Sequence, residues 1–195
     1  MNSTVIVLII IVVLLVIALG VAGAMLARRR RSENLQEHYG PEYERTVVET
    51  GDRRAAEAEL TEREKRVHGL DIRDLKPDER ERFETEWTDV QRGFVDDPVN
   101  SVHRADALVG DIMRTRGYPV DDDFERRAQD ISVEHPQVVQ HYREARETRV
   151  ATDNGQVDTE RQRHAITSYR ALIDALLNRD SVPTTTSTTR QEHTR

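Results

Sequence analysis

The sequence of 195 residues contains no cysteine, which excludes thiol catalysis and zinc sites with thiolate ligands. It contains no glycine-rich phosphate-binding loop, no H-E-x-x-H zinc motif and no G-x-S-x-G nucleophile motif. Aromatic residues make up only 5% of the chain, and no stretch alternates apolar and polar residues with a period of two. We therefore expect no strands, and we find no catalytic signature.

What the sequence does contain is one long apolar run at residues 5–27, with 23 residues and no charge. As a helix this run spans roughly 34 Å, which is enough to cross a hydrocarbon core of about 30 Å. A cleaved signal peptide is the alternative, because Ala22-Gly23-Ala24 imitates a cleavage site. However, the segment before the run has no basic residue and the run is too long, so we expect a retained transmembrane anchor.

Four consecutive arginines follow the run, and no basic residue precedes it. Basic residues beside a span prefer the cytoplasm and the anionic leaflet that faces it. We therefore expect a single-pass protein of the cytoplasmic membrane, with its N-terminus outside and residues 32–195 in the cytoplasm. The four residues that set this topology are Arg28, Arg29, Arg30 and Arg31. An envelope location of the domain is the alternative.

The second half of the apolar run carries small residues at four-residue spacing: Gly20 with Ala24, and Gly23 with Ala27. Such spacing lets two membrane helices approach closely, so these residues form a candidate face for homo-oligomerisation through the span. The alternative is that glycine and alanine are simply common in membrane helices.

The chain beyond the anchor is acidic. Without the four anchor arginines it holds 25 basic and 36 acidic side chains, a net charge of about −11. Such a domain is expected to bind nucleic acid poorly, because the affinity of proteins for nucleic acid comes mainly from basic side chains that neutralise phosphates. We expect membrane lipid and unidentified proteins as partners, and no nucleic acid.

Caps and apolar periodicity predict an all-α protein with four parts: an anchor (1–31), a helical juxtamembrane stalk (32–76), a soluble helical bundle (77–180) and a disordered, threonine-rich tail (181–195). Gly40-Pro41 should break the membrane helix, Asp52 and Asp97 are predicted N-caps, and Gly117 is a predicted C-cap. The expected helices beyond the break cover residues 41–50, 53–68, from 77 to the seam at 94, 98–116, 124–130, 136–150 and 159–178.

The helix at 53–68 carries a run of charges that indicates a solvated face or, less commonly, a partner-binding surface. Glu59 with Arg63, and Glu62 with Arg66, are spaced for ion pairs along this helix. In the next helix Phe83, Trp87, Val90 and Phe94 fall on one face, which is more typical of a core seam than of a cofactor pocket.

Histidine is the remaining lead for a metal site. Helical bundles can build metal centres from Glu and His on facing helices, but the paired Glu-x-x-His pattern of di-iron proteins is absent. We therefore expect no metal, no cofactor and no catalytic residue. The histidines considered are His103, His135, His141 and His164.

Four segments resemble an uncharacterised family of single-span, membrane-anchored helical proteins of actinobacteria. They are RGFVDDP (92–98), DIMRTRGYPVDD (111–122), SVEHPQVVQHYREA (132–145) and SYRALIDALL (168–177). The resemblance implies a helical membrane protein and assigns no functional residue.

These observations predict a membrane-tethered, non-catalytic interaction or scaffold module. The alternative is an enzyme whose active site lies among the helices, with Trp87, Tyr142, Tyr169 and the histidines around a pocket.

Overall fold

The computed structural model describes residues 3–121, 123–155 and 157–177, with side chains from residue 12 onward. Within these residues the chain forms eight α-helices and no strand, as the sequence predicts. The helices are α1 (Ser3–Tyr39), α2 (Pro41–Thr50), α3 (Arg53–His68), α4 (Pro77–Gly93), α5 (Pro98–Arg116), α6 (Phe124–Glu134), α7 (Val139–Asp153) and α8 (Thr159–Leu177). Asn178 and the tail predicted at 181–195 lie outside the described residues.

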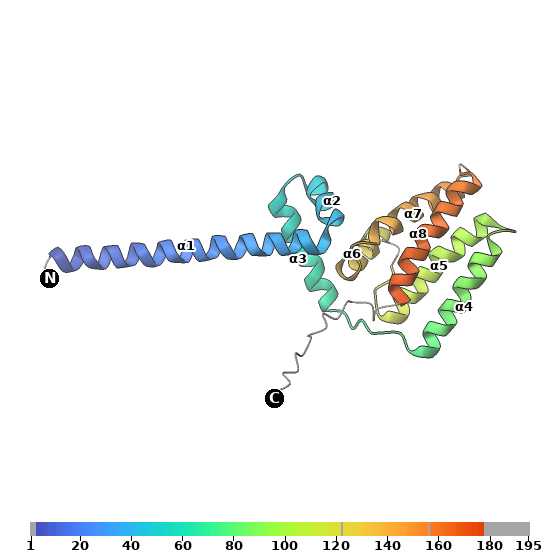
Figure 1. Ribbon diagram of the computed structural model, residues 1–195, viewed down its shortest axis with the longest axis horizontal. Helices are drawn as coiled ribbons and strands as arrows, with labels where there is room; N and C mark the ends of the chain where they lie inside the picture. The colour runs from blue at the N-terminus through green and yellow to red at the C-terminus, as the bar shows by residue number, and fades with distance from the viewer. Residues whose placement is uncertain (1–2, 122, 156, 178–195) are drawn as a thin grey trace, which may run out of the picture.

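Helix α1 projects from the rest of the protein as a single rod (Figure 1). Every residue from 12 to 31 is exposed, including apolar side chains such as Leu19, 72% exposed, and Met25, 66% exposed. A fully exposed apolar helix is unfavourable in water, at about 25 cal/mol for each Å². The structure therefore has one N-terminal helix that is long and apolar enough to span a membrane.

The end of α1 belongs to a small core of its own. Gly40 takes a φ of +48°, which a residue with a side chain rarely adopts, and Pro41 then begins α2. Asp52 caps α3 by accepting a hydrogen bond from the Ala55 N–H at 3.0 Å, as the sequence predicts. These turns fold α2 and α3 back against α1. The apolar residues they bury together are Leu35, Tyr39, Tyr43 and Leu60.

The main core lies between α4, α5, α7 and α8, where α8 packs against both α7 and α5. The aromatic seam is part of it, because Phe83 and Trp87 are buried, 1% and 6% exposed. Phe94 is half-buried and follows the last residue of α4. The predicted caps of α5 are also confirmed: Asp97 accepts a hydrogen bond from the Asn100 N–H, and Gly117 ends the helix.

Two predicted boundaries around Pro136 are wrong. Helix α6 continues to Glu134 instead of ending at Asp130, and α7 begins at Val139 instead of Pro136. The physical reason is a tight turn: the His135 N–H still bonds to Ile131 O at 2.8 Å, and the Val138 N–H bonds to His135 O at 3.1 Å. Pro136 therefore sits inside the turn that reverses the chain and does not occupy the first helical position.

Candidate functional site

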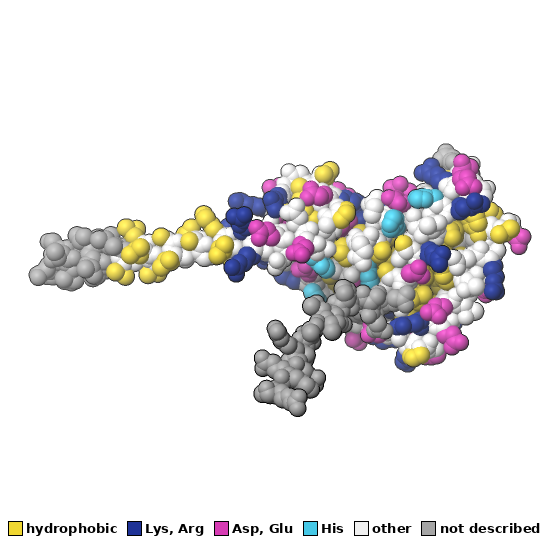
Figure 2. All heavy atoms as spheres, viewed as in Figure 1, with side chains coloured by type: hydrophobic (Ala, Val, Ile, Leu, Met, Phe, Trp, Pro, Cys, Tyr) yellow, Lys and Arg dark blue, Asp and Glu magenta, His cyan; other side chains and the backbone are white. Residues whose placement is uncertain are grey.

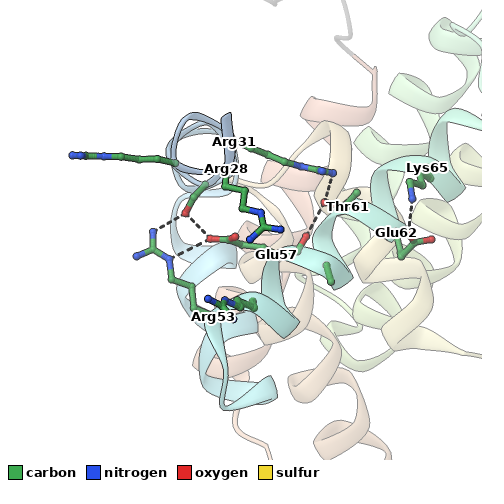
Figure 3. Close-up of a pocket in the computed structure, with 11 residues that line it drawn as sticks. Arg28, Arg31, Arg53, Glu57, Thr61, Glu62 and Lys65 are labelled. Carbon is green, nitrogen blue, oxygen red and sulfur yellow. Dashed lines mark hydrogen bonds and ion pairs between the residues drawn. The ribbon is translucent and has the colours of Figure 1, made fainter. Parts of the chain in front are cut away.

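A groove of 720 Å³ lies where α3 crosses α1, just beyond the apolar part of α1 (Figure 3). We call it the basic groove. From α1 it takes side chains that directly follow the apolar run, and from α3 it takes one face of the helix. The lining residues are Arg28, Arg29, Arg31, Ser32, Arg53, Arg54, Glu57, Ala58, Thr61, Glu62 and Lys65.

At one end of the basic groove, a carboxylate and a guanidinium group of the lining neutralise each other. Glu57 receives hydrogen bonds from Arg53 at 3.2 Å, from the Tyr43 hydroxyl at 3.0 Å and from the Ser32 hydroxyl. Partial burial acts to raise the pKa of Glu57, but these hydrogen bonds outweigh it and lower the pKa below its ordinary value. Glu57 is therefore ionised at neutral pH and holds α1 and α3 together at this end.

The rest of the basic groove keeps an excess of positive charge. Lys65 pairs with Glu62 at 2.7 Å, whereas the one partner of Arg31 within the described part of the chain is the neutral hydroxyl of Thr61, at 2.9 Å. Arg28 and Arg54 have no carboxylate within 4.0 Å among the residues that the structure describes. Arg29 pairs with Glu33, which lies outside the lining, at 3.0 Å. With six cations and two carboxylates in its lining, the groove still has the sign opposite to that of the acidic domain.

The structure places the four predicted topology residues at the junction between the apolar rod and the domain. In Figure 2 dark blue side chains gather there, at the end of the yellow helix. All four are exposed, and Arg28, Arg29 and Arg31 line the basic groove, while Arg30 does not. Sequence reasoning assigned these arginines to membrane topology and to contact with the anionic leaflet, and not to a groove shared with α3.

The small residues of the span, Gly20, Gly23, Ala24 and Ala27, are all exposed on α1. A Cβ atom built on Gly20 or Gly23 would meet nothing within 4 Å. The described part of the chain therefore leaves this face uncovered, and self-association through it stays a prediction.

The contribution of α3 to the basic groove was missed from the sequence. The helical spacing of the groove residues on α3 shows that they share one face of that helix, but it does not show which other helix this face packs against. These residues are Arg54, Ala58, Thr61 and Lys65. The missing information is the sharp reversal at Gly40 and Gly51, which brings α3 back across α1.

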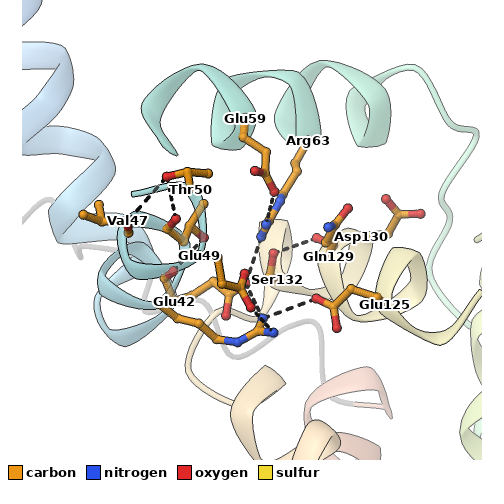
Figure 4. A network of polar contacts seen from close by, with 12 residues as sticks. Glu42, Val47, Glu49, Thr50, Glu59, Arg63, Glu125, Gln129, Asp130 and Ser132 are labelled. Atoms are coloured by element: carbon orange, nitrogen blue, oxygen red, sulfur yellow. Dashed lines mark hydrogen bonds and ion pairs between the residues drawn. The ribbon is translucent and has the colours of Figure 1, made fainter. Parts of the chain in front are cut away.

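A buried ion-pair network ties this region to the bundle (Figure 4). Glu42 of α2, 3% exposed, accepts a hydrogen bond from Arg63 of α3 at 2.8 Å and two from Arg143 of α7, at 2.7 and 3.0 Å. Arg63 also pairs with Glu59, as the spacing predicts. Because Arg63 is only 1% exposed, the expectation of a wholly solvated face on α3 is wrong at this residue.

Further polar contacts join the same elements. Arg66 pairs with Asp130 of α6 at 2.8 Å instead of with Glu62, the partner its spacing suggested. The His38 ring lies 2.9 Å from Val133 O, which connects the end of α1 to α6. Burial acts to raise the pKa of Glu125, but Arg143 outweighs it and lowers that pKa. The segment between the anchor and the bundle is therefore packed onto α6 and α7.

The aromatic residues of the alternative active site pack in the core. The Tyr142 and Tyr169 rings lie 6.5 Å apart, and burial raises the pKa of both hydroxyls. A second cavity, of 510 Å³, lies beside Phe124 and is lined by neither of them, nor by Trp87.

His103, His141 and His164 lie at the surface of the bundle, whereas His135 is buried in the turn between α6 and α7. His103 lies 3.0 Å from Asp153, and His141 and His164 both lie near Glu144, at 3.7 and 4.0 Å. Among the described residues there is no group of three or more His, Asp or Glu side chains that could hold a metal ion.

Comparison of this chain with family models, with curated proteins and with solved structures gives no match.

Proposed function

We propose that this chain is a single-pass protein of the cytoplasmic membrane, with its N-terminus outside and its helical domain on the cytoplasmic side. We further propose that the domain acts there as a non-catalytic interaction or scaffold module, and that the chain belongs with the actinobacterial proteins it resembles. The observation that carries the proposal is that α1 is apolar and exposed from residue 12 up to the four arginines Arg28–Arg31.

The way in which α1 joins the domain supports a scaffold function. A flexible tether would let the domain tumble, but here α1 runs unbroken from residue 3 to residue 39 and its end is buried, with Tyr39 only 1% exposed. The ion pairs of Glu42 with Arg63 and Arg143 then fix α2 and α3 to the bundle. The domain would therefore be held at a set height and orientation over the membrane, which raises the effective concentration of partners that bind it there.

The packing of Trp87, Tyr142 and Tyr169 in the core supports a module without a catalytic pocket at these residues. The acidic surface would favour partners with basic surfaces, because complementary charge speeds association and selects against other acidic proteins.

A topology reporter tests the proposal. A reporter that is active only in the cytoplasm, fused after Arg195, should be active in cells. Replacing Arg28–Arg31 with Asn and adding Lys beside Asn2 should weaken or invert this result, because the charge bias is then reversed. An inactive reporter on the unaltered chain would contradict the orientation. Cross-linking the same chain in membranes should capture a protein partner or a second copy at the domain if it is a scaffold.

A further inference from the structure

We propose that the basic groove binds the phosphate of an anionic phospholipid headgroup from the leaflet that borders Arg28. This inference rests on the proposed membrane anchoring and deepens it. It turns a general attraction between arginines and the membrane into a defined lipid site, built by α1 and α3 together. The ligand chemistry is a phosphate ester, and the source is the membrane in which α1 lies.

The position of the groove fits the headgroup layer. Arg28 immediately follows the last residue of the apolar run, so at about 1.5 Å per residue Arg28 and Arg31 lie within one helical turn of the hydrocarbon boundary. The apolar side chains just before them, Met25 and Leu26, are 66% and 55% exposed. A lipid with its headgroup in the groove therefore finds apolar helix surface for its acyl chains directly below.

The contribution of α3 distinguishes this site from an ordinary run of juxtamembrane arginines. Arg54 and Lys65 line the groove from α3. The close-up shows Lys65 on α3 beyond Thr61, the residue to which Arg31 of α1 bonds (Figure 3). An isolated basic run attracts anionic leaflets without a fixed geometry. Two helices that cross at a fixed angle instead present cations on two sides of one space.

The charge of the groove also requires a counter-ion. Arg28 and Arg54 have no acidic partner among the described residues, and Arg31 has only the Thr61 hydroxyl. A guanidinium group binds phosphate oxygens through two parallel N–H donors, which makes arginine well suited to this ligand. Three of the groove cations are already paired, Arg53 with Glu57, Lys65 with Glu62 and Arg29 with Glu33. The excess positive charge therefore rests on Arg28, Arg31 and Arg54.

Native mass spectrometry of the full chain in neutral detergent tests the site. Phosphatidylglycerol is added as the anionic lipid, phosphatidylcholine as the neutral lipid and inorganic phosphate as the soluble source. We expect adducts of one phosphatidylglycerol at concentrations at which phosphatidylcholine gives few and inorganic phosphate gives none.

The double variant Arg54→Gln, Lys65→Gln removes two groove cations and leaves the anchor arginines intact. It should weaken the affinity for phosphatidylglycerol about tenfold, because each basic residue near an anionic membrane surface strengthens binding to it several-fold. The control Arg92→Gln, Arg163→Gln removes the same charge from two exposed sites outside the groove and should bind like the unaltered chain. Both variants should melt at the same temperature as the unaltered chain, since all four side chains are exposed.

Equal binding of phosphatidylglycerol by the groove variant and the control would overturn the proposal, and so would equal binding of the two lipids. Phosphate adducts without lipid preference would overturn the lipid assignment in favour of a soluble ligand. The topology reporter separates this failure from that of the proposed function. An active cytoplasmic reporter together with lost lipid preference rejects the site alone. An inactive reporter rejects the proposed orientation, and release of the protein from membranes at alkaline pH rejects the anchoring on which the site rests.

Discussion

Arg143 donates two hydrogen bonds, of 2.7 and 3.0 Å, to the carboxylate of Glu42, a residue 101 positions earlier in the chain. Both side chains are buried, and Arg63 donates a third bond to the same carboxylate. Glu42 therefore links the segment next to the membrane with the bundle. Its charge is needed because two buried guanidinium groups converge on it.

Replacing Glu42 with Gln should destabilise the protein by about 3 kcal/mol, because breaking a buried ion pair leaves a charge uncompensated away from water. Urea unfolding of the full chain in detergent measures this, with the single tryptophan, buried Trp87, as the fluorescence probe. The matched control is Glu49→Gln in the same helix, where the carboxylate is 46% exposed and pairs with Arg45. The control should cost less than about 1 kcal/mol. Equal losses for the two variants would show that the network contributes nothing beyond a surface pair.

The predicted domain boundary before Pro77 can be tested by replacing Arg143, the partner of Glu42 in the bundle. The main core falls almost entirely within residues 75–177, so a fragment of residues 77–180 should fold and melt cooperatively. In that fragment Arg143 has lost Glu42 together with the α2 and α3 segments that cover it. We therefore expect Arg143→Gln to cost about 3 kcal/mol in the full chain and under about 1 kcal/mol in the fragment. A fragment that stays unfolded would show that residues 32–76 are an integral part of the bundle.

The linker before α4 should make the protein sensitive to acid. Two hydrogen bonds from Arg73, each 2.7 Å, and one from the Lys76 N–H lower the pKa of Glu79 to about 2, from an ordinary value of 4.5. The folded state thus binds this proton more weakly than the unfolded state does. The stability that the ionised Glu79 carboxylate contributes to the fold is therefore complete above about pH 4.5 and is lost as the pH falls towards 2.

The corresponding experiment compares the unaltered chain with Glu79→Gln and with Glu81→Gln, an exposed carboxylate of the same helix. Between pH 4.5 and 2 the Glu79→Gln variant should lose less stability than the unaltered chain, and Glu81→Gln should follow the unaltered chain. Parallel curves for all three would contradict the shifted pKa of Glu79.

Self-association through the span can be separated from folding. Because a Cβ on Gly20 meets nothing within 4 Å, Gly20→Leu should leave the fold of the chain unchanged. If two copies associate through the small residues, this variant should weaken dimer formation in a membrane two-hybrid assay at least about fivefold. Val16→Leu, at an exposed position one turn earlier, provides a conservative control. A dimer signal that is the same in both variants would exclude this face.

Local structure could be predicted from the sequence because its causes are local. Asp52, Asp97 and Gly117 cap the helices that they were expected to cap, and the seam of Phe83 and Trp87 is buried as its spacing predicts. Pro136 misled the prediction, since proline suits a tight turn as well as the first position of a helix.

The candidate sites could be predicted only in part. Arg28–Arg31 stand out as a run beside an apolar segment, whereas Arg54 and Lys65 join them only through the fold. Glu42 and Arg143 look like ordinary surface charges in sequence, because nothing local marks a partner 101 residues away. Contacts of this kind depend on the angle at which helices meet, and that angle is set at the turns.

If α1 crosses the membrane and leaves the helical domain in the cytoplasm, the two ends of α1 face different compartments, and the absence of cysteine allows this to be measured directly. Single cysteines are placed at Asn2 and at Val95, which is 85% exposed between α4 and α5, and intact cells are treated with a membrane-impermeant maleimide. We expect Asn2→Cys to be labelled in intact cells and Val95→Cys to be labelled only after the membrane is opened. Labelling of Val95→Cys in intact cells would show that the domain lies outside, and release of the protein from membranes at alkaline pH would show that α1 does not cross the membrane.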